Sequence, residues 1–123
     1  MGNPVVEFQI LSKSPDETAH FYSQLFGWTV NADNPLGYRR IATGSAGGIQ
    51  GGIWPAPPQA MNFVQLFIEV DDVKASAAKA DSLGAKVVIP PATLPGGDEM
   101  AVLQDPHGMT FGVYRRAVTE ARQ

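Results

Sequence analysis

The hydrophobic pattern at the start of the chain predicts a β-strand. Val6, Phe8 and Ile10 alternate with Glu7 and Gln9, and a period of two places these two sets on opposite faces of a strand. One face is therefore apolar, and the other carries two polar side chains. We expect the apolar face to pack in the core and the polar face to be available for another role.

A helix is predicted directly after this strand. Ser14 is a suitable N-cap residue, Pro15 suits the first helical position, and Glu17 can complete a capping box with Ser14. Apolar residues then recur at helical spacing, and Gly27 is placed to end the helix. The apolar positions of this helix are Ala19, Tyr22, Leu25 and Phe26.

The same order of signals recurs in the second half of the chain. A strand over residues 63–70 leads through two aspartates into an alanine-rich helix over 73–83, and Gly84 ends this helix as Gly27 ends the first one. The two glycines are 57 positions apart (84 − 27). A strand–helix–strands unit written twice is typical of an internal repeat. The short strands expected after the helices cover residues 28–31, 38–43 and 48–54 in the first unit and 86–89, 99–104 and 109–115 in the second.

Each unit is too small to form a core alone, so we expect one domain, residues 1–123, in which the two share a core. The predicted fold class is α+β. Two βαβββ modules, residues 4–56 and 63–116, are joined by the proline-rich linker 57–62 and followed by a tail at 117–123. One helix covers only one face of a module's sheet, so we expect a curved, cup-shaped mixed sheet with the helices on its outer face. Small ligands bind in such a cup.

Composition and charge exclude several classes of function. The chain has a formal net charge of -3 and no run of basic residues, which argues against binding to nucleic acid or to an anionic membrane surface. No apolar stretch is long enough to span a bilayer, and the N-terminal segment lacks the features of a secretory signal. We therefore expect a cytoplasmic protein. The absence of cysteine excludes disulfides, thiolate nucleophiles and Cys-based metal sites.

Three segments carry a resemblance to a known family: they read PDETAHFYSQLFGW, FIEVDDVKASAAKADSLGAKV and LQDPHGMTFGVYR. They are similar to segments of the vicinal oxygen chelate superfamily, which includes glyoxalase I, extradiol dioxygenases and bleomycin- or fosfomycin-resistance proteins. The resemblance covers residues 4–116 and implies the paired-module fold. For a single-domain member of this length it also implies a homodimer, with modules paired within or between chains. The motifs are more specific for the fold than for the reaction.

The resemblance also implies where a catalytic metal would be held. Catalytic members place metal ligands at four strand positions, which correspond here to Glu7, Gly52, Gln65 and Gly112. Glycine offers no donor atom, and one carboxylate with one amide is a weak ligand set for a divalent metal. We therefore expect that the chain holds neither the metal of the family nor another cofactor.

The strand face opposite the core is the candidate binding face. The helices should cover the hydrophobic face, formed by Phe8, Ile10, Ile53, Leu66, Ile68, Phe111 and Val113. The predicted ligand-binding residues on the other face are Gln9, Gln50, Gly52, Trp54, Gln65, Phe67, Thr110, Gly112 and Tyr114. This mixture of aromatic, amide and hydroxyl groups is typical of a small-molecule pocket. Its mid-strand glycines fit either close approach of a ligand or a tight contact between strands. A third interpretation is that the face is buried between modules or copies.

Glu7 is the candidate catalytic residue. On a central strand with apolar neighbours, its carboxyl would be partly desolvated, which raises a carboxyl pKa and suits a general base. The alternative is a structural ion pair with Arg39 or Arg40. These two arginines are adjacent on one predicted strand and so point to opposite faces, but the sequence does not tell which one faces the cup.

Two functions follow from this pattern. The favoured one is a glyoxalase-like or bleomycin-resistance-like protein that binds a small, partly aromatic molecule in the cup without a metal. The alternative is an enzyme of the same superfamily, of lyase, isomerase or dioxygenase type, either metal-free with Glu7 as acid/base or metal-dependent. The expected partners are a small molecule and a second copy of the chain, with no nucleic acid and no membrane.

Overall fold

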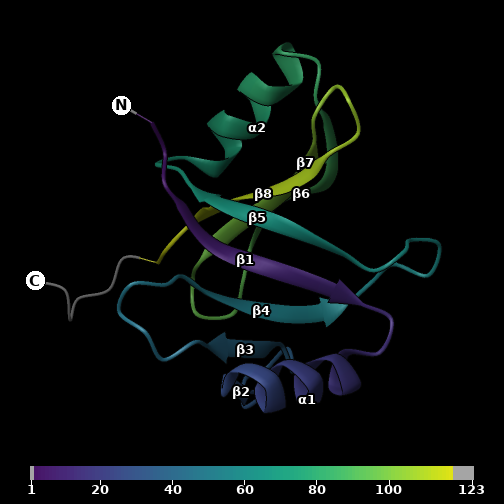
Figure 1. Ribbon diagram of the computed structural model, residues 1–123. Coiled ribbons are helices and arrows are strands. Elements are labelled where there is room, and N and C mark those ends of the chain that lie inside the picture. The colour runs from purple at the N-terminus through teal and green to yellow at the C-terminus, as the bar shows by residue number, and fades with distance from the viewer. Residues whose placement is uncertain (1, 118–123) are drawn as a thin grey trace, which may run out of the picture. The chain divides into compact units, whose positions relative to one another are not determined.

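The computed structural model describes residues 2–117, and within them each half of the chain follows the order strand, helix, strand, strand, strand (Figure 1). The first half contains β1 (Val5–Ser12), α1 (Pro15–Phe26), β2 (Thr29–Asn31), β3 (Arg39–Ala42) and β4 (Gln50–Pro55). The second half contains β5 (Phe63–Glu69), α2 (Val73–Ser82), β6 (Lys86–Thr93), β7 (Glu99–Gln104) and β8 (Thr110–Arg115). This order confirms the predicted α+β class with two βαβββ repeats.

The chain divides into two compact units. One covers Val6–Leu66, and the other combines the first five residues with the chain from Phe67 onwards. We call them the first and the second unit. The division falls within β5, so the start of this strand belongs to the first unit.

In the first unit the strand order is β2-β3-β4-β1. β1 and β4 are parallel, whereas β3 pairs with both β2 and β4 in antiparallel fashion. Helix α1 contacts β2 and β4, and its buried Ala19 packs with Ile41 and Ile53. Phe8 and Ile10 pack against this cluster, which confirms that the apolar face of β1 lies on the helix side.

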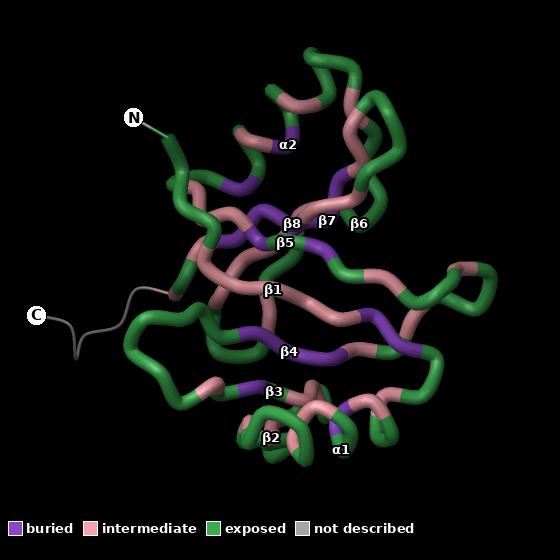
Figure 2. The backbone as a smooth tube through the Cα atoms, viewed as in Figure 1, coloured by how far each residue is buried: buried purple, intermediate pink, exposed green. Residues whose placement is uncertain are grey.

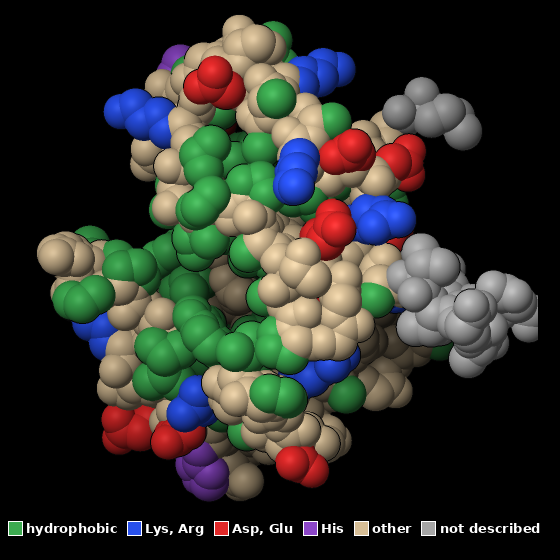
Figure 3. Space-filling model, turned by 180° about the vertical axis from the view of Figure 1, so that it is seen from behind, with side chains coloured by type: hydrophobic (Ala, Val, Ile, Leu, Met, Phe, Trp, Pro, Cys, Tyr) green, Lys and Arg blue, Asp and Glu red, His purple; other side chains and the backbone are tan. Residues whose placement is uncertain are grey.

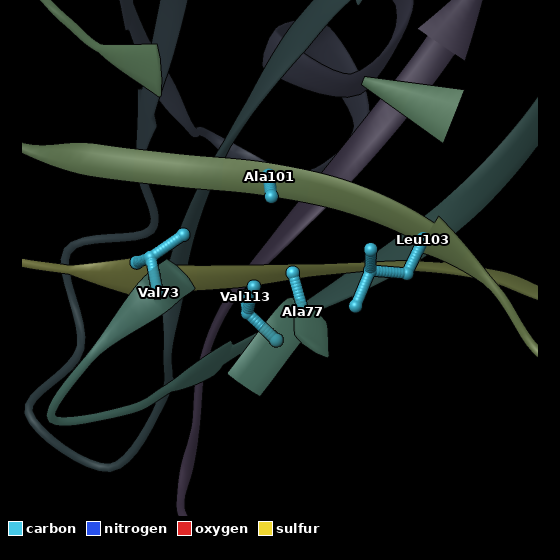
Figure 4. Packing of buried hydrophobic residues seen from close by; sticks show 5 residues of the cluster. All are labelled: Val73, Ala77, Ala101, Leu103 and Val113. Carbon is cyan, nitrogen blue, oxygen red and sulfur yellow. The ribbon is translucent and has the colours of Figure 1, made fainter. Parts of the chain in front are cut away.

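In the second unit the strand order is β5-β8-β7-β6, with β5 and β8 parallel and the other pairs antiparallel. Helix α2 lies against β6, β7 and β8. Its core cluster consists of Val73, Ala77, Ala101, Leu103 and Val113, and Figure 4 shows these side chains converging from α2, β7 and β8. Phe111 packs against the cluster, so Phe111 and Val113 are on the core face as predicted.

Two groups of residues expected in the core are instead exposed. Leu66 is 47% exposed, because β5 buries Gln65 and Phe67 on one face and turns Leu66 to the other. On α1, Leu25 and Phe26 are 57% and 56% exposed. Only Ala19 of that helix is buried, so its predicted apolar side is covered only in part.

The helix ends agree with the sequence except at one cap. Gly27 adopts the left-handed conformation, with φ of 72°, and the side chain of Asp72 accepts from the backbone N–H of Ala75 at 2.9 Å. The predicted capping box of Ser14 is wrong, because its side chain makes no cap hydrogen bond. The backbone N–H of Ser14 instead donates to the hydroxyl of the buried Ser12 at 2.9 Å.

Burial is concentrated on the strands. Figure 2 shows buried stretches along β4 in the first unit and along β7 and β8 in the second, with mostly exposed helices and connections. On the face that Figure 3 presents, acidic and basic side chains are interspersed. No helix within residues 2–117 is both long and apolar enough to cross a membrane.

Candidate functional site

Three polar side chains of the first unit form a hydrogen-bonded series. Nε2 of Gln65 on β5 donates to Oε1 of Gln9 on β1 at 2.6 Å, and Gln9 is hydrogen-bonded to the hydroxyl of Tyr38. Tyr38 directly precedes β3. We call Gln65, Gln9 and Tyr38 the amide–phenol row. The row joins three segments that are far apart in the sequence.

One end of the row is an unsatisfied acceptor. Gln65 is only 5% exposed, and among the described residues nothing donates to its Oε1. A buried carbonyl oxygen that lacks a donor costs about 1–3 kcal/mol, and such a group calls for a bound water or ligand donor. Oε1 of Gln65 therefore offers a ligand or water an acceptor that no described group of the protein uses.

The other end of the row lies over a glycine. Gly52 on β4 is in register with Gln9 on β1 and with Arg40 on β3. A Cβ atom at Gly52 would overlap Oη and Cζ of Tyr38, so only glycine leaves room for this phenol. The ring that approaches Gly52 in this structure thus belongs to the protein itself.

Burial raises the pKa of Tyr38 from 10.0 to about 12. Its hydrogen bond with Gln9 acts in the opposite direction and lowers the pKa, which fits an amide N–H that donates to the phenol oxygen. The charge of Glu7 raises the pKa of Tyr38, and the charge of Arg40 lowers it. Tyr38 therefore stays a neutral phenol at neutral pH.

The position of Tyr38 is fixed by its neighbours. The side chain of Asn34 donates through Nδ2 to the carbonyl oxygen of Tyr38 at 2.7 Å and accepts from its N–H through Oδ1 at 2.9 Å. The Tyr38 ring contacts the ring of Trp54, with centroids 5.6 Å apart. The predicted site residues Gln9, Gly52, Trp54 and Gln65 are thus brought together around a tyrosine.

The structure resolves which arginine faces the row. Nε of Arg39 donates to Oδ1 of Asp16 on α1 at 2.7 Å, so Arg39 points to the helix side. Arg40 is on the other side, where its charge acts on Tyr38. Of the two arginines considered as ion-pair partners of Glu7, Arg39 thus pairs with Asp16 on the helix side, and Arg40 is the one on the side of the row.

Gln50 is not part of the row. It is in register with Glu7, but it is exposed, and its Oε1 accepts from the backbone N–H of Thr43 at 2.6 Å. This hydrogen bond ties β4 to the end of β3.

In the second unit the predicted residues form a different arrangement. Gly112 is in register with Phe67, and a Cβ at Gly112 would lie 2.6 Å from Cε2 and Cζ of that ring. The hydroxyl of Tyr114 donates to Oδ2 of Asp98 at 2.6 Å. Thr110 pairs with Gln104 at the start of β8. Gly112 thus also accommodates an aromatic ring of the protein.

The residues present do not fit the metal of the family. The spaces at Gly52 and at Gly112 are each taken by a ring, Tyr38 in the first unit and Phe67 in the second. Within residues 2–117, no three His, Asp or Glu side chains are grouped as metal ligands. A metal would take the amide oxygen of Gln65 and the carboxylate of Glu7, and these two donors are a weak ligand set for a divalent metal.

Two hollows on the surface of the first unit lie away from the row. One, of about 750 Å³, is lined by α1 alone, and another, of about 410 Å³, lies between α1, the end of β1 and residues 62–64. Gln9, Tyr38 and Gln65 line neither hollow. Both of these hollows lie on the helix side. The row is therefore a candidate site because of its hydrogen bonds and packing, and not because it lines one of these hollows.

Tyr38 is the site residue that sequence reasoning missed. The signal was present, because Tyr38 and Arg40 alternate with Arg39 and the buried Ile41 along the same strand. An apolar Ile41 on the core face predicts that Tyr38 and Arg40 share the opposite face. The overlap with Gly52 depends on strand register, which this alternation does not give.

Comparison with known proteins places the chain in a family. The profile of the glyoxalase-like domain family matches residues 6–114. "Putative glyoxylase CFP32" of Mycobacterium tuberculosis is 33% identical over 112 residues, covering 89% of this chain and 42% of the relative. "Anthracycline biosynthesis protein DnrV" of Streptomyces peucetius is 28% identical over 128 residues, covering 89% and 46%. The chain thus spans less than half the length of these curated relatives.

Solved structures show the same fold at low identity. A variant of Streptomyces coelicolor methylmalonyl-CoA epimerase in complex with 2-nitronate-propionyl-CoA has a TM-score of 0.62 and 19% identity, covering 95% of this chain and 96% of that chain. Hypothetical protein BH1468 from Bacillus halodurans has a TM-score of 0.69 and 12% identity, covering 97% and 98%. With the family profile, these likenesses show that the chain belongs to the glyoxalase-like domain family of the vicinal oxygen chelate superfamily.

Proposed function

We propose that this glyoxalase-like domain binds a small, partly aromatic organic molecule at the amide–phenol row of its first unit, without a metal ion. The observation that carries the proposal is the unsatisfied Oε1 of the buried Gln65. Trp54 adds an aromatic surface beside Tyr38. An aromatic wall with a few convergent polar groups is the usual construction of a small-molecule site.

The chemistry of the row defines the ligand class. Gln65 requires a donor, such as a hydroxyl or amide N–H. Its Oε1 is enclosed, so a ligand group reaches it when the amide turns or the side chains around it move apart. A neutral, flat compound with hydroxyl and carbonyl groups satisfies the row and stacks on Trp54. The relatives support this class: one is named for anthracycline biosynthesis, and the epimerase structure holds an acyl-CoA analogue.

A fragment screen followed by NMR tests the proposal. Uniformly ¹⁵N-labelled protein, stripped of metals with a chelator, is titrated with a library of neutral aromatic fragments bearing hydroxyl or carbonyl groups. We expect the side-chain amide resonances of Gln9 and Gln65, assigned with Gln→Leu variants, to shift on binding. Thr43 and Gln50 serve as control positions, because they lie outside the row. Fragments that bind elsewhere, or that bind only after a divalent metal is added, would contradict the proposal.

A second candidate function is acid/base catalysis by Glu7. The charge of Glu7 acts on Tyr38, so a carboxylate and a neutral phenol lie near each other. Such a pair suits removal of a proton next to a carbonyl group, with the carboxylate as base and the phenol as donor to the oxygen. Solvent-deuterium exchange into methylmalonyl-CoA, followed by NMR, tests it. An exchange rate that is unchanged in Glu7→Gln would remove Glu7 as the base.

The assembly and the location of the protein stay predictions. We expect a homodimer, and light scattering coupled to size-exclusion chromatography checks it by giving the mass of the particle. A mass equal to that of one 13.1 kDa chain would contradict this expectation. The location in the cytoplasm is likewise an expectation from the sequence.

A further inference from the structure

Two observations concern the space above Gly52. This glycine corresponds to a metal-ligand position in the catalytic members that the sequence resembles, and it carries no side chain. The space above it is filled by the phenol of Tyr38, whose Oη and Cζ lie where a Cβ would be. A neutral donor group from the segment before β3 thus lies where a metal-ligand side chain would begin.

We propose that the hydroxyl of Tyr38, lying over Gly52, donates a hydrogen bond to an oxygen atom of the bound molecule and so takes the part that a metal ion has in catalytic relatives. The ligand class is then a carbonyl compound, because a carbonyl oxygen accepts one short hydrogen bond from a phenol. This inference rests on the proposed function of the row and names the acceptor group that the ligand must carry.

The hydrogen bonds of the row leave the phenol proton available. Oε1 of Gln9 accepts from Gln65, and the lowering effect of Gln9 on the pKa of Tyr38 fits its Nε2, a donor, as the group that faces the phenol oxygen. A phenol oxygen that accepts from an amide still has its own O–H to give. Within residues 2–117 no acceptor for this O–H is observed in the row, and its partner would be the ligand.

The phenol is also held in place before a ligand arrives. Asn34 fixes the backbone of Tyr38 by two hydrogen bonds, at 2.7 and 2.9 Å, and Trp54 contacts one side of the ring. Gly52 closes the side toward β4. A donor held at a fixed position loses little further freedom when it binds, which favours both affinity and selectivity.

The electrostatic surroundings favour a neutral oxygen over a carboxylate. The negative Glu7 and the positive Arg40 both act on the hydroxyl, in opposite directions. A phenol is neutral at pH 7 even at its ordinary pKa of 10.0, and burial raises the pKa of Tyr38 further. An uncharged carbonyl accepts from this donor without placing a second negative charge beside Glu7.

Two matched probes test the inference, 1-acetylnaphthalene and 1-ethylnaphthalene, which differ in the carbonyl oxygen. We expect Tyr38→Phe to weaken binding of the ketone about tenfold, which is the effect of one hydrogen bond. The affinity for the hydrocarbon should stay unchanged. The infrared carbonyl band of the bound ketone should lie at lower wavenumber in wild type than in Tyr38→Phe. Tyr22→Phe is the matched control, because Tyr22 stacks on Trp28 at the helix side.

Each result has a defined meaning. If Tyr38→Phe weakened the binding of both probes equally, or left the carbonyl band unchanged, Tyr38 would not be the donor to the carbonyl oxygen. The proposed binding function would still stand. If wild type bound neither naphthalene probe nor any aromatic fragment, the proposed function would fall first, and this inference with it.

A second set of variants acts through Gly52. A methyl group at this position overlaps the phenol, so Gly52→Ala should displace Tyr38 and remove the preference for the ketone as Tyr38→Phe does. The double variant Gly52→Ala/Tyr38→Ala removes the overlap, so we expect it to fold and likewise to show no preference. A Gly52→Ala protein that folds and keeps the wild-type preference would overturn the inference.

Discussion

Both units place a strand glycine beneath an aromatic ring, but the ring is polar in the first unit and apolar in the second. In each, a buried glycine on a strand after the helix lies beneath an aromatic ring, Gly52 under Tyr38 and Gly112 under Phe67. Tyr38 is partly exposed and belongs to a hydrogen-bonded row, whereas Phe67 is 6% exposed and apolar. The glycine makes room for a ring in both cases. The side chain that fills this room decides whether the unit gains a hydrogen-bond donor or only packing.

The largest predicted loss of stability comes from a substitution at Gly112. In Gly112→Val the added Cβ meets the ring of Phe67 at 2.6 Å, and Phe67 is too buried to move aside. We expect a loss of about 3 kcal/mol in the free energy of unfolding, the upper part of the usual range for overpacking. Urea denaturation checks it. Phe67→Ala in the same chain should recover part of the loss, and a Gly112→Val protein as stable as wild type would contradict the comparison.

The corresponding change in the first unit should be milder. Gly52→Ala places a methyl group in the phenol of Tyr38, but this residue is partly exposed and directly follows a connection, so the ring can turn outward. We expect a loss of about 1–2 kcal/mol, measured in the same urea series. A loss larger than that of Gly112→Val would show that Tyr38 is as fixed as Phe67.

The two amides of the row should respond unequally to replacement by leucine. Gln9→Leu removes the partner of Gln65 and leaves a buried amide without hydrogen bonds, at a cost of about 2 kcal/mol. Gln65→Leu also removes the unsatisfied Oε1, so its net effect on stability should be below about 1 kcal/mol. Thermal and urea unfolding check this order. Equal losses would indicate that Oε1 of Gln65 has a partner in solution, such as a bound water.

The last predicted effect concerns stability at alkaline pH. A tyrosine in the unfolded chain loses its proton near pH 10, whereas Tyr38 keeps it to about pH 12. The folded state binds more protons between these values, so stability falls as the pH rises from 10 to 12. Tyr38→Phe should reduce this fall, and Tyr22→Phe should not. A phenolate absorbance change assigned to Tyr38 near pH 10 would contradict the burial of this phenol.

The sequence predicted the fold well because its signals are local. Gly27 and Asp72 mark the helix ends correctly, and the alternation of β1 places Phe8 and Ile10 on the core side. Ser14 is the N-cap residue as predicted, but its side chain makes no cap hydrogen bond, and its backbone N–H donates to the hydroxyl of Ser12 instead of the side chain of Glu17.

The candidate site was predicted only in part because it depends on register. Gln9, Gly52 and Gln65 were identified as members of one strand face, and the structure brings them together in the first unit. Tyr38 was missed, because its overlap with Gly52 results from the pairing of β3 with β4. Pairing between strands is a tertiary property that alternation within one strand does not contain.

The most direct test is a crystal structure of the protein with 1-acetylnaphthalene, with anomalous diffraction data to detect metals. We predict that the ketone oxygen lies within hydrogen-bonding distance of Oη of Tyr38, that the ring system contacts Trp54, and that no metal is present at Glu7 and Gln65. A metal ion coordinated by Glu7 and Gln65, or a ketone bound away from Tyr38, would contradict the account.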